Sequence, residues 1–191
     1  MPWTVSICSS MAPDSPPPAH TASRRIGGVM LAAAWVVVIA VVSMLFTDLL
    51  QGQRNPNQDV SSERGAAGEV HVRLRENRQG HYLASGRIND EPVLFLLDTG
   101  ATDVSVPADL ARRLGLTRGA AVRARTANGV ITTWRTTLEQ VQLGDIVLHD
   151  VRASINPGMS GHEVLLGMSF LRELDFVQRD GTLVLTHRQA G

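Results

Sequence analysis

The fold is decided by the stretch Val93-Leu94-Phe95-Leu96-Leu97-Asp98-Thr99-Gly100-Ala101-Thr102, in which five apolar residues precede a carboxylate, a hydroxyl and a glycine. An apolar run this short, between Pro92 and Gly100, predicts a strand that is buried on both faces. Asp98 would emerge from the end of that strand, where a carboxylate is costly to ionise unless neighbours hydrogen-bond it. Thr99 can supply a hydroxyl, and Gly100 lets the backbone turn its N–H toward the carboxylate. Asp98 is therefore the first catalytic candidate, and an aspartate that only caps the next turn is the alternative.

The charge of the chain is balanced. Its 191 residues include 18 basic residues, all of them arginine, and 18 acidic residues, so the formal net charge is zero. The arginines do not gather into a basic stripe. Nucleic acid is therefore not an expected partner.

The longest apolar run is Ile26 to Phe46, 21 residues without a charge. As a helix it would be about 32 Å long, which matches the hydrocarbon core of a bilayer. The alternative is a cleaved secretory signal, but such signals have apolar cores of about 7 to 15 residues and end at a small-x-small site. This run ends in Ser43-Met44-Leu45-Phe46. We therefore predict a single transmembrane helix over residues 26–46 that contacts the lipid bilayer.

The residues around the apolar run predict its orientation. Arg24 and Arg25 precede the run, whereas the first arginine after it is Arg54. This bias predicts an inner (cytoplasmic) membrane protein with its N-terminus in the cytoplasm and the rest of the chain in the periplasm or outside. The proline-rich residues 1–25, which hold the single cysteine Cys8, are predicted to be a disordered cytoplasmic tail. The polar residues 47–68 are predicted to be a flexible linker.

Residues 69–191 have the pattern of a β-rich domain. Val70, Val72 and Leu74 alternate with polar residues, which predicts a strand with one apolar face. Further short strands are predicted at 81–88, 104–106, 122–126, 130–136, 138–143, 146–155, 176–178 and 182–186, with short helices at 107–114 and 168–172. Turn signals every eight to twelve residues or so and one or two short helices predict a mostly β domain with a single core.

Two further elements follow the Asp98 stretch. Ala127-Asn128-Gly129 separates two β-prone runs, and Asn-Gly in that position is a strong hairpin signal. Trp134 lies on the returning strand, where a core or dimer contact is more expected than contact with substrate. Farther along, Glu163-Val164-Leu165-Leu166-Gly167 is a second apolar run that ends in glycine.

In this order and spacing, Phe95 to Thr102, the Asn128-Gly129 hairpin and Val164 to Met168 resemble the retropepsin-like aspartic proteases, specifically their bacterial membrane-anchored members. The likeness extends from Glu69 to Arg188. It implies a retropepsin-like half-barrel and an aspartic endopeptidase that acts on an extended peptide or protein substrate. Peptide hydrolysis of this kind uses two carboxylates that share a proton. Because the chain holds one Asp-Thr-Gly triplet, the resemblance implies a homodimer with a shared site.

The resemblance also implies roles for individual residues. Asp98 would be the catalytic residue of each subunit, and the loop around it would be supported by the residues Thr99, Gly100, Ala101, Thr102, Leu165, Leu166 and Gly167. The hairpin tip would form a substrate-binding flap from the residues Ala127, Asn128, Gly129 and Val130. No metal or cofactor is implied.

Other functions are less well supported by the sequence. The adjacent pairs His149-Asp150 and His162-Glu163 have no known metal-ligand spacing. Ser105 and Ser169 lack the context of a nucleophile elbow. The main alternative is a catalytically inactive retropepsin-like module that serves in dimerisation or peptide binding at the membrane, because the fold alone does not require catalysis.

Overall fold

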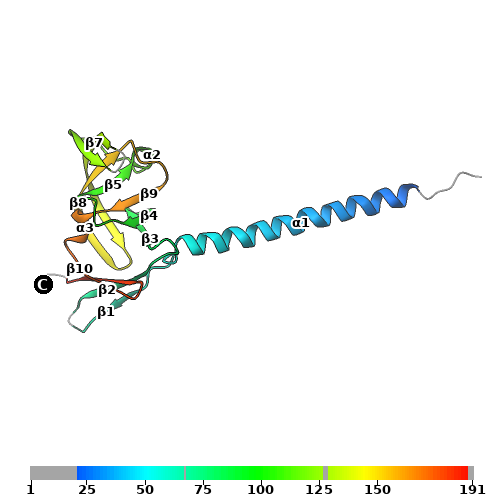
Figure 1. Cartoon of the computed structure of the whole chain (residues 1–191), viewed down its shortest axis with the longest axis horizontal. Helices are drawn as coiled ribbons and strands as arrows, with labels where there is room; N and C mark the ends of the chain where they lie inside the picture. The colour runs from blue at the N-terminus through cyan, green and yellow to red at the C-terminus, as the bar shows by residue number, and fades with distance from the viewer. Residues whose placement is uncertain (1–20, 67, 127–128, 189–191) are drawn as a thin grey trace, which may run out of the picture. The chain divides into compact units, whose positions relative to one another are not determined.

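The structure is a computed structural model that describes residues 21–66, 68–126 and 129–188 (Figure 1). The predicted disordered tail, except for residues 21–25, and Cys8 within it lie outside these residues. The chain divides into two compact units, Met1–Thr47 and Asp48–Gly191, which are described separately.

Helix α1 (Thr21–Arg54) contains the predicted apolar segment 26–46. Its described side chains between Met30 and Leu45 include large apolar residues that are exposed, among them Trp35 and Ile39. The side chains of 26–29, 32 and 46 lie outside those that the structure describes. Among the described residues, no helix is both long and apolar enough to cross a membrane. The transmembrane helix therefore stays a prediction.

The second unit contains two β-sheets. The smaller sheet has the order β1-β2-β11-β10, and the larger has the order β3-β4-β9-β5-β8-β7-β6 (Figure 1). The strands are β1 (Ser62–Arg64), β2 (Val70–Arg75), β3 (Leu83–Ile88), β4 (Glu91–Leu97), β5 (Val104–Pro107), β6 (Ala121–Thr126), β7 (Gly129–Leu143), β8 (Ile146–Asn156), β9 (Glu163–Leu166), β10 (Asp175–Arg179) and β11 (Thr182–His187). The helices are α2 (Ala108–Arg113) and α3 (Met168–Leu171). The prediction of a mostly β domain with few short helices is confirmed.

The larger sheet closes on itself. Arg87 and Ile88 of β3 pair with Gln142 and Val141 of β7, so six strands form a ring and β6 extends from it. Two pairings in this ring are parallel, β4 with β9 and β5 with β8. Closure removes exposed strand edges and encloses one core. The fully buried side chains in that core include Phe95, Leu138, Ile155, Leu166 and Phe170.

Local turn chemistry explains where the strands reverse. Asn89 and Asp90 both have positive φ in the turn between β3 and β4, and Asp180 and Gly181 do so between β10 and β11. Two consecutive positive φ values suit a tight hairpin between twisted strands. The predicted strands 130–136 and 138–143 are one continuous strand, β7, because Thr137 between them does not interrupt the pairing with β8.

The expectation that the strand before Asp98 is buried on both faces is wrong for the single chain. Val93 and Phe95 of β4 are buried, but Leu94, Leu96 and Leu97 are only half-buried. Burial therefore alternates along the strand, as in a sheet with one more buried face.

Much of the predicted flexible linker 47–68 is regular or buried in the structure, because α1 continues to Arg54 and buried residues and a strand follow it. Asn57 is buried, and its side-chain Nδ2 donates to the carbonyls of Arg75 at 2.8 Å and Leu83 at 2.6 Å. Its Oδ1 accepts a hydrogen bond from the Arg75 N–H at 2.7 Å. The side chain therefore joins the end of β2 to the start of β3. Strand β1, at Ser62–Arg64, lies in the same predicted linker.

Replacing Asn57 by alanine should lower the free energy of unfolding by about 3 kcal/mol, because buried backbone groups lose their partners. Urea unfolding of the Asn57→Ala protein measures this, with Gln58→Ala, at an exposed neighbouring position, as the control. Equal unfolding free energies for the two variants would contradict the assigned role of Asn57.

Candidate active site

The loop that follows β4 holds Asp98 by backbone hydrogen bonds on both sides. The Asp98 N–H donates to the Leu166 carbonyl at 3.2 Å, and the Ala101 N–H donates to the Asp98 carbonyl at 3.2 Å. The Gly100 N–H donates to the Asp98 side-chain Oδ1 at 2.9 Å. The carboxylate is half-buried and keeps a fixed orientation. A carboxylate held by a backbone donor at the end of a strand can act in proton transfer.

The second apolar element packs directly behind this loop. Strand β9 runs parallel to β4, with Leu96 opposite Leu165 and Leu97 opposite Leu166. The Met168 N–H, one residue beyond Gly167, donates to the Ala101 carbonyl at 2.8 Å. Two elements that are far apart in sequence therefore fix the backbone around Asp98.

Gly167 is at the closest approach between these elements. A Cβ atom at this position would lie 2.4 Å from the Asp103 carbonyl oxygen and 2.7 Å from the Ala101 carbonyl oxygen. Its φ of −87° is open to any residue, so the requirement for glycine comes from space and not from backbone conformation.

The remaining residues of the Asp-Thr-Gly loop point outward. Thr99 and Thr102 are exposed, and Ala101 is half-buried. Within the described part of the chain, the Thr99 hydroxyl has no hydrogen-bond partner in the single subunit.

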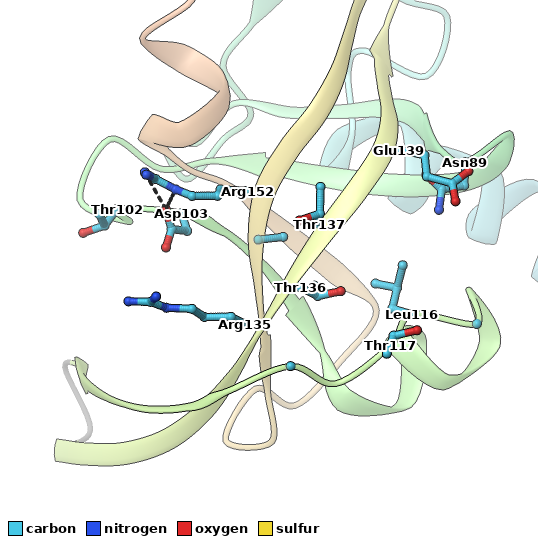
Figure 2. A pocket seen from close by; sticks show the side chains of 13 residues that line it. Asn89, Thr102, Asp103, Leu116, Thr117, Arg135, Thr136, Thr137, Glu139 and Arg152 are labelled. Carbon is cyan, nitrogen blue, oxygen red and sulfur yellow. Dashed lines mark hydrogen bonds and ion pairs between the residues drawn. The ribbon is translucent and has the colours of Figure 1, made fainter.

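A groove of about 820 Å³ begins at Asp98. Its walls come from the Asp98 loop, from β6 and β7, and from the segment that follows β8. Buried polar residues Ser105, Thr133 and Asn156 form part of its lining. A second hollow of about 760 Å³ adjoins the groove and shares Thr102, Asp103 and Arg135 with it (Figure 2). The two together form an extended surface beside the carboxylate.

The predicted flap is the β6–β7 hairpin. Ala127 and Asn128 at its tip lie outside the described residues. Gly129 has a φ of 114°, which glycine adopts without strain, and Val130 is 54 % exposed. The antiparallel pairing of Thr126 with Gly129 confirms the predicted hairpin. Trp134 on β7 is half-buried, and the Arg118 guanidinium lies 4.6 Å from the centre of its ring.

Two interactions near the site were not predicted from the sequence. The Ser169 hydroxyl accepts a hydrogen bond from the Val104 N–H at 2.9 Å and donates to the Arg152 carbonyl at 2.7 Å, so it links α3, β5 and β8. Arg152 in turn forms an ion pair with Asp103 at 3.2 Å (Figure 2). Asp103 is five positions beyond Asp98, but its partner is distant in sequence, so no local pattern indicated the pair.

Tyr82 contacts the end of β4, the strand that precedes Asp98. Its carbonyl accepts a hydrogen bond from the Leu97 N–H at 3.0 Å. Burial, and secondly the negative charge of Glu76, raise the pKa of the Tyr82 phenol above 10.0. The phenol is therefore neutral at physiological pH and acts as a core side chain.

The histidines of the considered metal pairs are exposed. His149 and Asp150 lie on β8, and His162 precedes β9. Across 21–66, 68–126 and 129–188, no group of three or more His, Cys, Asp or Glu side chains is arranged to hold a metal ion.

Comparison with known proteins shows which family the residues around this site match. Residues 84–173 match the family described as "gag-polyprotein putative aspartyl protease". A crystal structure of a retropepsin-like aspartic protease from Rickettsia conorii superposes with a TM-score of 0.52 at 24% identity, covering 68% of this chain and 94% of that one. Residues 84–173, which contain the site, therefore match the retropepsin-like family. The match contains β4, Asp98 and β9, the elements that carried the resemblance in the sequence.

Two further similar proteins are more distant. The EIAV protease, solved in complex with the inhibitor HBY-793, has a TM-score of 0.43 at 22% identity, over 52% of this chain and 92% of that one. An uncharacterized protein from the cobV 5′ region of a Sinorhizobium species is 27% identical over 114 residues, 58% of this chain and 49% of that protein. The chain thus spans about half the length of that curated relative.

Proposed function

We propose that the chain is an aspartic endopeptidase that hydrolyses peptide bonds with a water molecule activated by the paired Asp98 side chains of a homodimer. The observation that carries this proposal is the position of Asp98. Its carboxylate is fixed by the Gly100 N–H and lies at the wall of a groove of about 820 Å³. A groove of this kind can accept an extended peptide next to the carboxylate.

The proposed chemistry needs one ionised and one protonated carboxyl group. The ionised Asp98 takes a proton from water as the water oxygen bonds to the peptide carbonyl carbon, and the protonated Asp98 gives its proton to the carbonyl oxygen. The tetrahedral intermediate then returns one hydroxyl proton to a carboxylate. The C–N bond breaks as the amine nitrogen takes the proton that the other Asp98 accepted from water, which leaves a carboxylic acid and an amine.

The second carboxyl group is proposed to come from another copy of the chain. Among the residues that line the groove, the other carboxylate is Asp103, and its Oδ1 is paired with Arg152. Asp103 is therefore already engaged by another side chain. Two-fold symmetry supplies an identical, unpaired Asp98 instead.

The edge of β10 is a suitable surface for this dimer. In the described part of the chain, β10 pairs with β11 on one side only, and Phe176 and Val177 are 42% and 65% exposed. Its sequence Asp175-Phe176-Val177-Gln178-Arg179 is complementary to itself in antiparallel pairing. With Val177 opposite its own copy, Asp175 of each chain would face Arg179 of the other. These pairs would replace the ion pairs within one chain, Asp175 with Arg188 at 3.1 Å and Arg179 with Asp180 at 3.5 Å.

A charge exchange tests this arrangement. Asp175→Arg alone and Arg179→Asp alone should each place like charges opposite one another and raise the dimer dissociation constant, on the order of tenfold. An equimolar mixture of the two variants should dimerise again, because both cross-strand pairs become attractive in the mixed dimer. Analytical ultracentrifugation measures this, with Arg113→Asp as a control for the same charge change elsewhere. Wild-type association of each single variant, or no recovery on mixing, would exclude β10 as the interface.

Residues 26–46 are proposed to anchor the protease in the inner membrane, with the N-terminus in the cytoplasm and the protease domain in the periplasm or outside. The exposed apolar side chains of α1 support this proposal, because a helix that is apolar all round needs an apolar environment. Anchoring confines the copies to two dimensions and favours a weak dimer. The chain should be recovered in the membrane fraction after a high-salt wash. Added protease should digest the folded unit only after the outer membrane is permeabilised.

The experiment that tests the proposed activity is cleavage of a peptide library at mildly acidic pH, read by mass spectrometry. Hydrolysis at internal bonds that is blocked by pepstatin-type or retroviral-type inhibitors is the expected result. A protein that assembles normally and cleaves nothing in the library would point to the inactive binding module instead.

A further inference from the structure

The floor of the groove beside Asp98 contains hydroxyl groups. Ser105 on β5 pairs with Ser154 on β8 and with Leu165 on β9, and residues paired in this way project from the same face of a sheet. All three line the groove. The residues that alternate with them on these strands are buried in the core; they are Val104, Val106, Ala153, Ile155, Val164 and Leu166. The groove therefore lies on the face of the sheet that is turned away from the core.

Asn156 adds an amide group to the same floor. It lies two residues beyond Ser154 on β8, so both side chains project from one face, and it lines the groove although it is only 7% exposed. Its Oδ1 accepts a hydrogen bond from the Gly158 N–H at 2.8 Å, which identifies the other amide atom as Nδ2. In the part of the chain that the structure describes, Nδ2 has no hydrogen-bond partner, yet solvent reaches it. This group can therefore donate to a molecule in the groove.

The serine hydroxyls supply acceptors and a further donor. Ser105 is 8% exposed, and its Oγ lies 3.4 Å from the Ser154 Oγ, with either atom able to donate. This contact uses one of the two hydroxyl protons, so the second proton and several oxygen lone pairs stay free. Thr133 differs, because its hydroxyl already donates to the Val122 carbonyl at 3.3 Å. We call Ser105, Ser154 and Asn156 the polar floor.

The walls around the polar floor are mostly apolar. Val122 on β6 lies opposite Thr133 on β7, and Ala124 lies opposite Ile131, and all four line the groove. Water can satisfy the polar floor when the groove is empty. A peptide that displaces this water without replacing its hydrogen bonds loses affinity. The polar floor should therefore discriminate between side chains that differ in hydrogen-bonding groups.

We propose that the polar floor is a subsite for the carboxamide side chain of a Gln or Asn residue in the bound peptide. The carboxamide oxygen accepts a hydrogen bond from Asn156 Nδ2, and the carboxamide NH₂ donates to the Oγ atoms of Ser105 and Ser154. An apolar side chain would leave these groups without partners, and a carboxylate has no proton for the serine oxygens. This inference rests on the proposed peptidase function and specifies its substrate class.

Peptide binding to the full chain carrying Asp98→Asn tests the subsite without turnover. The labelled peptides share an apolar central pair and carry Gln, Met or Glu at one of the three positions on either side of the central bond. Fluorescence anisotropy should show about tenfold tighter binding of Gln than of Met at one position on each side, because the proposed dimer has two equal subsites. Gln should also bind more tightly than Glu there.

Two results of this scan would overturn the proposal. One is equal binding of the Gln and Met peptides at every position. The other is tighter binding of Glu than of Gln, which would assign recognition to a carboxylate partner such as Arg135, the exposed residue opposite Ser154 on β7.

Substitutions then test the polar floor itself. Ser105→Ala combined with Ser154→Ala removes both hydroxyls, so neither is left without its partner in the fold. Asn156→Ser removes Nδ2 and keeps an oxygen for the Gly158 N–H. Each variant should reduce the preference for Gln over Met to about threefold or less. Urea unfolding checks that both variants are folded.

The matched control is Thr132→Val. Thr132 is exposed and alternates with Ile131 and Thr133 on β7, so its hydroxyl is removed from the face away from the groove. This variant should keep the tenfold preference. Full preference in both folded polar-floor variants, or its loss in the control, would overturn the proposal.

Cleavage of the same peptides by the wild type separates this inference from the proposed function. If the wild type cuts the Gln and Met peptides with the same kcat/KM, and the Asp98→Asn chain binds them equally, the peptidase stands and the carboxamide subsite is wrong. If the wild type cuts neither peptide but the Gln peptide binds selectively through the polar floor, the subsite stands and the peptidase is wrong.

Discussion

Asp98→Asn is expected to lower the kcat for peptide cleavage by about 10³-fold or more, because an amide can neither take the proton of water nor return it. The substitution keeps the shape of the side chain, and the amide oxygen can still accept the Gly100 N–H that now bonds Oδ1 at 2.9 Å. Peptide binding should therefore persist while turnover is lost. Initial rates with a cleaved library peptide, and anisotropy with an uncleaved analogue, measure the two effects separately.

The control for this variant is Asp180→Asn, which removes a carboxylate that is 91% exposed in the β10–β11 turn. It should retain wild-type rates. Thermal unfolding should show that the wild type, Asp98→Asn and Asp180→Asn are folded to the same extent at the assay temperature. Undiminished cleavage by a folded Asp98→Asn protein would show that this carboxylate has no role in the chemistry.

Gly167→Ala is expected to affect both stability and activity. The new methyl group would lie 2.4 Å from the Asp103 carbonyl oxygen, so β9 and the Asp98 loop must separate. Overpacking of this kind costs roughly 1 to 3 kcal/mol of unfolding free energy. Because the shift displaces the loop that holds the carboxylate, kcat/KM should fall by about 10²-fold even where the protein is fully folded.

Gly52→Ala is the matched control for this substitution. Gly52 lies in α1, and a Cβ atom there would meet nothing within 4 Å, so the variant should be as stable as the wild type or slightly more so. Urea unfolding and initial rates measure both variants. A Gly167→Ala protein with wild-type stability and rate would show that the contact between β9 and the loop does not position Asp98.

The elements of this fold could be predicted because their signals are local. The alternation of Val70, Val72 and Leu74 predicted β2, and all three side chains are buried. The Asn-Gly signal predicted the β6–β7 hairpin, and the Gly144-Asp145 turn joins β7 to β8. Each of these depends on neighbours within a few residues of sequence.

The features that sequence did not predict depend on distant partners. Asn57 was assigned to a linker because residues 47–68 are mostly polar, but its three side-chain hydrogen bonds go to Arg75 and Leu83, 18 and 26 positions away. Residues 122–126 were predicted as a strand, yet only the pairing of β6 with β7 brings that strand to the groove beside Asp98. The Asp103–Arg152 ion pair likewise joins groups 49 positions apart.

The most direct test of the paired carboxylates is a mixing experiment. Wild-type protein and Asp98→Asn protein are combined at constant total concentration, allowed to exchange subunits, and assayed for peptide cleavage as the wild-type fraction is varied. If each site needs one Asp98 from each of two chains, activity falls as the square of the wild-type fraction, to about one quarter in an equal mixture. Activity that falls in direct proportion, to about one half in that mixture, would show that one chain suffices and would contradict the shared site.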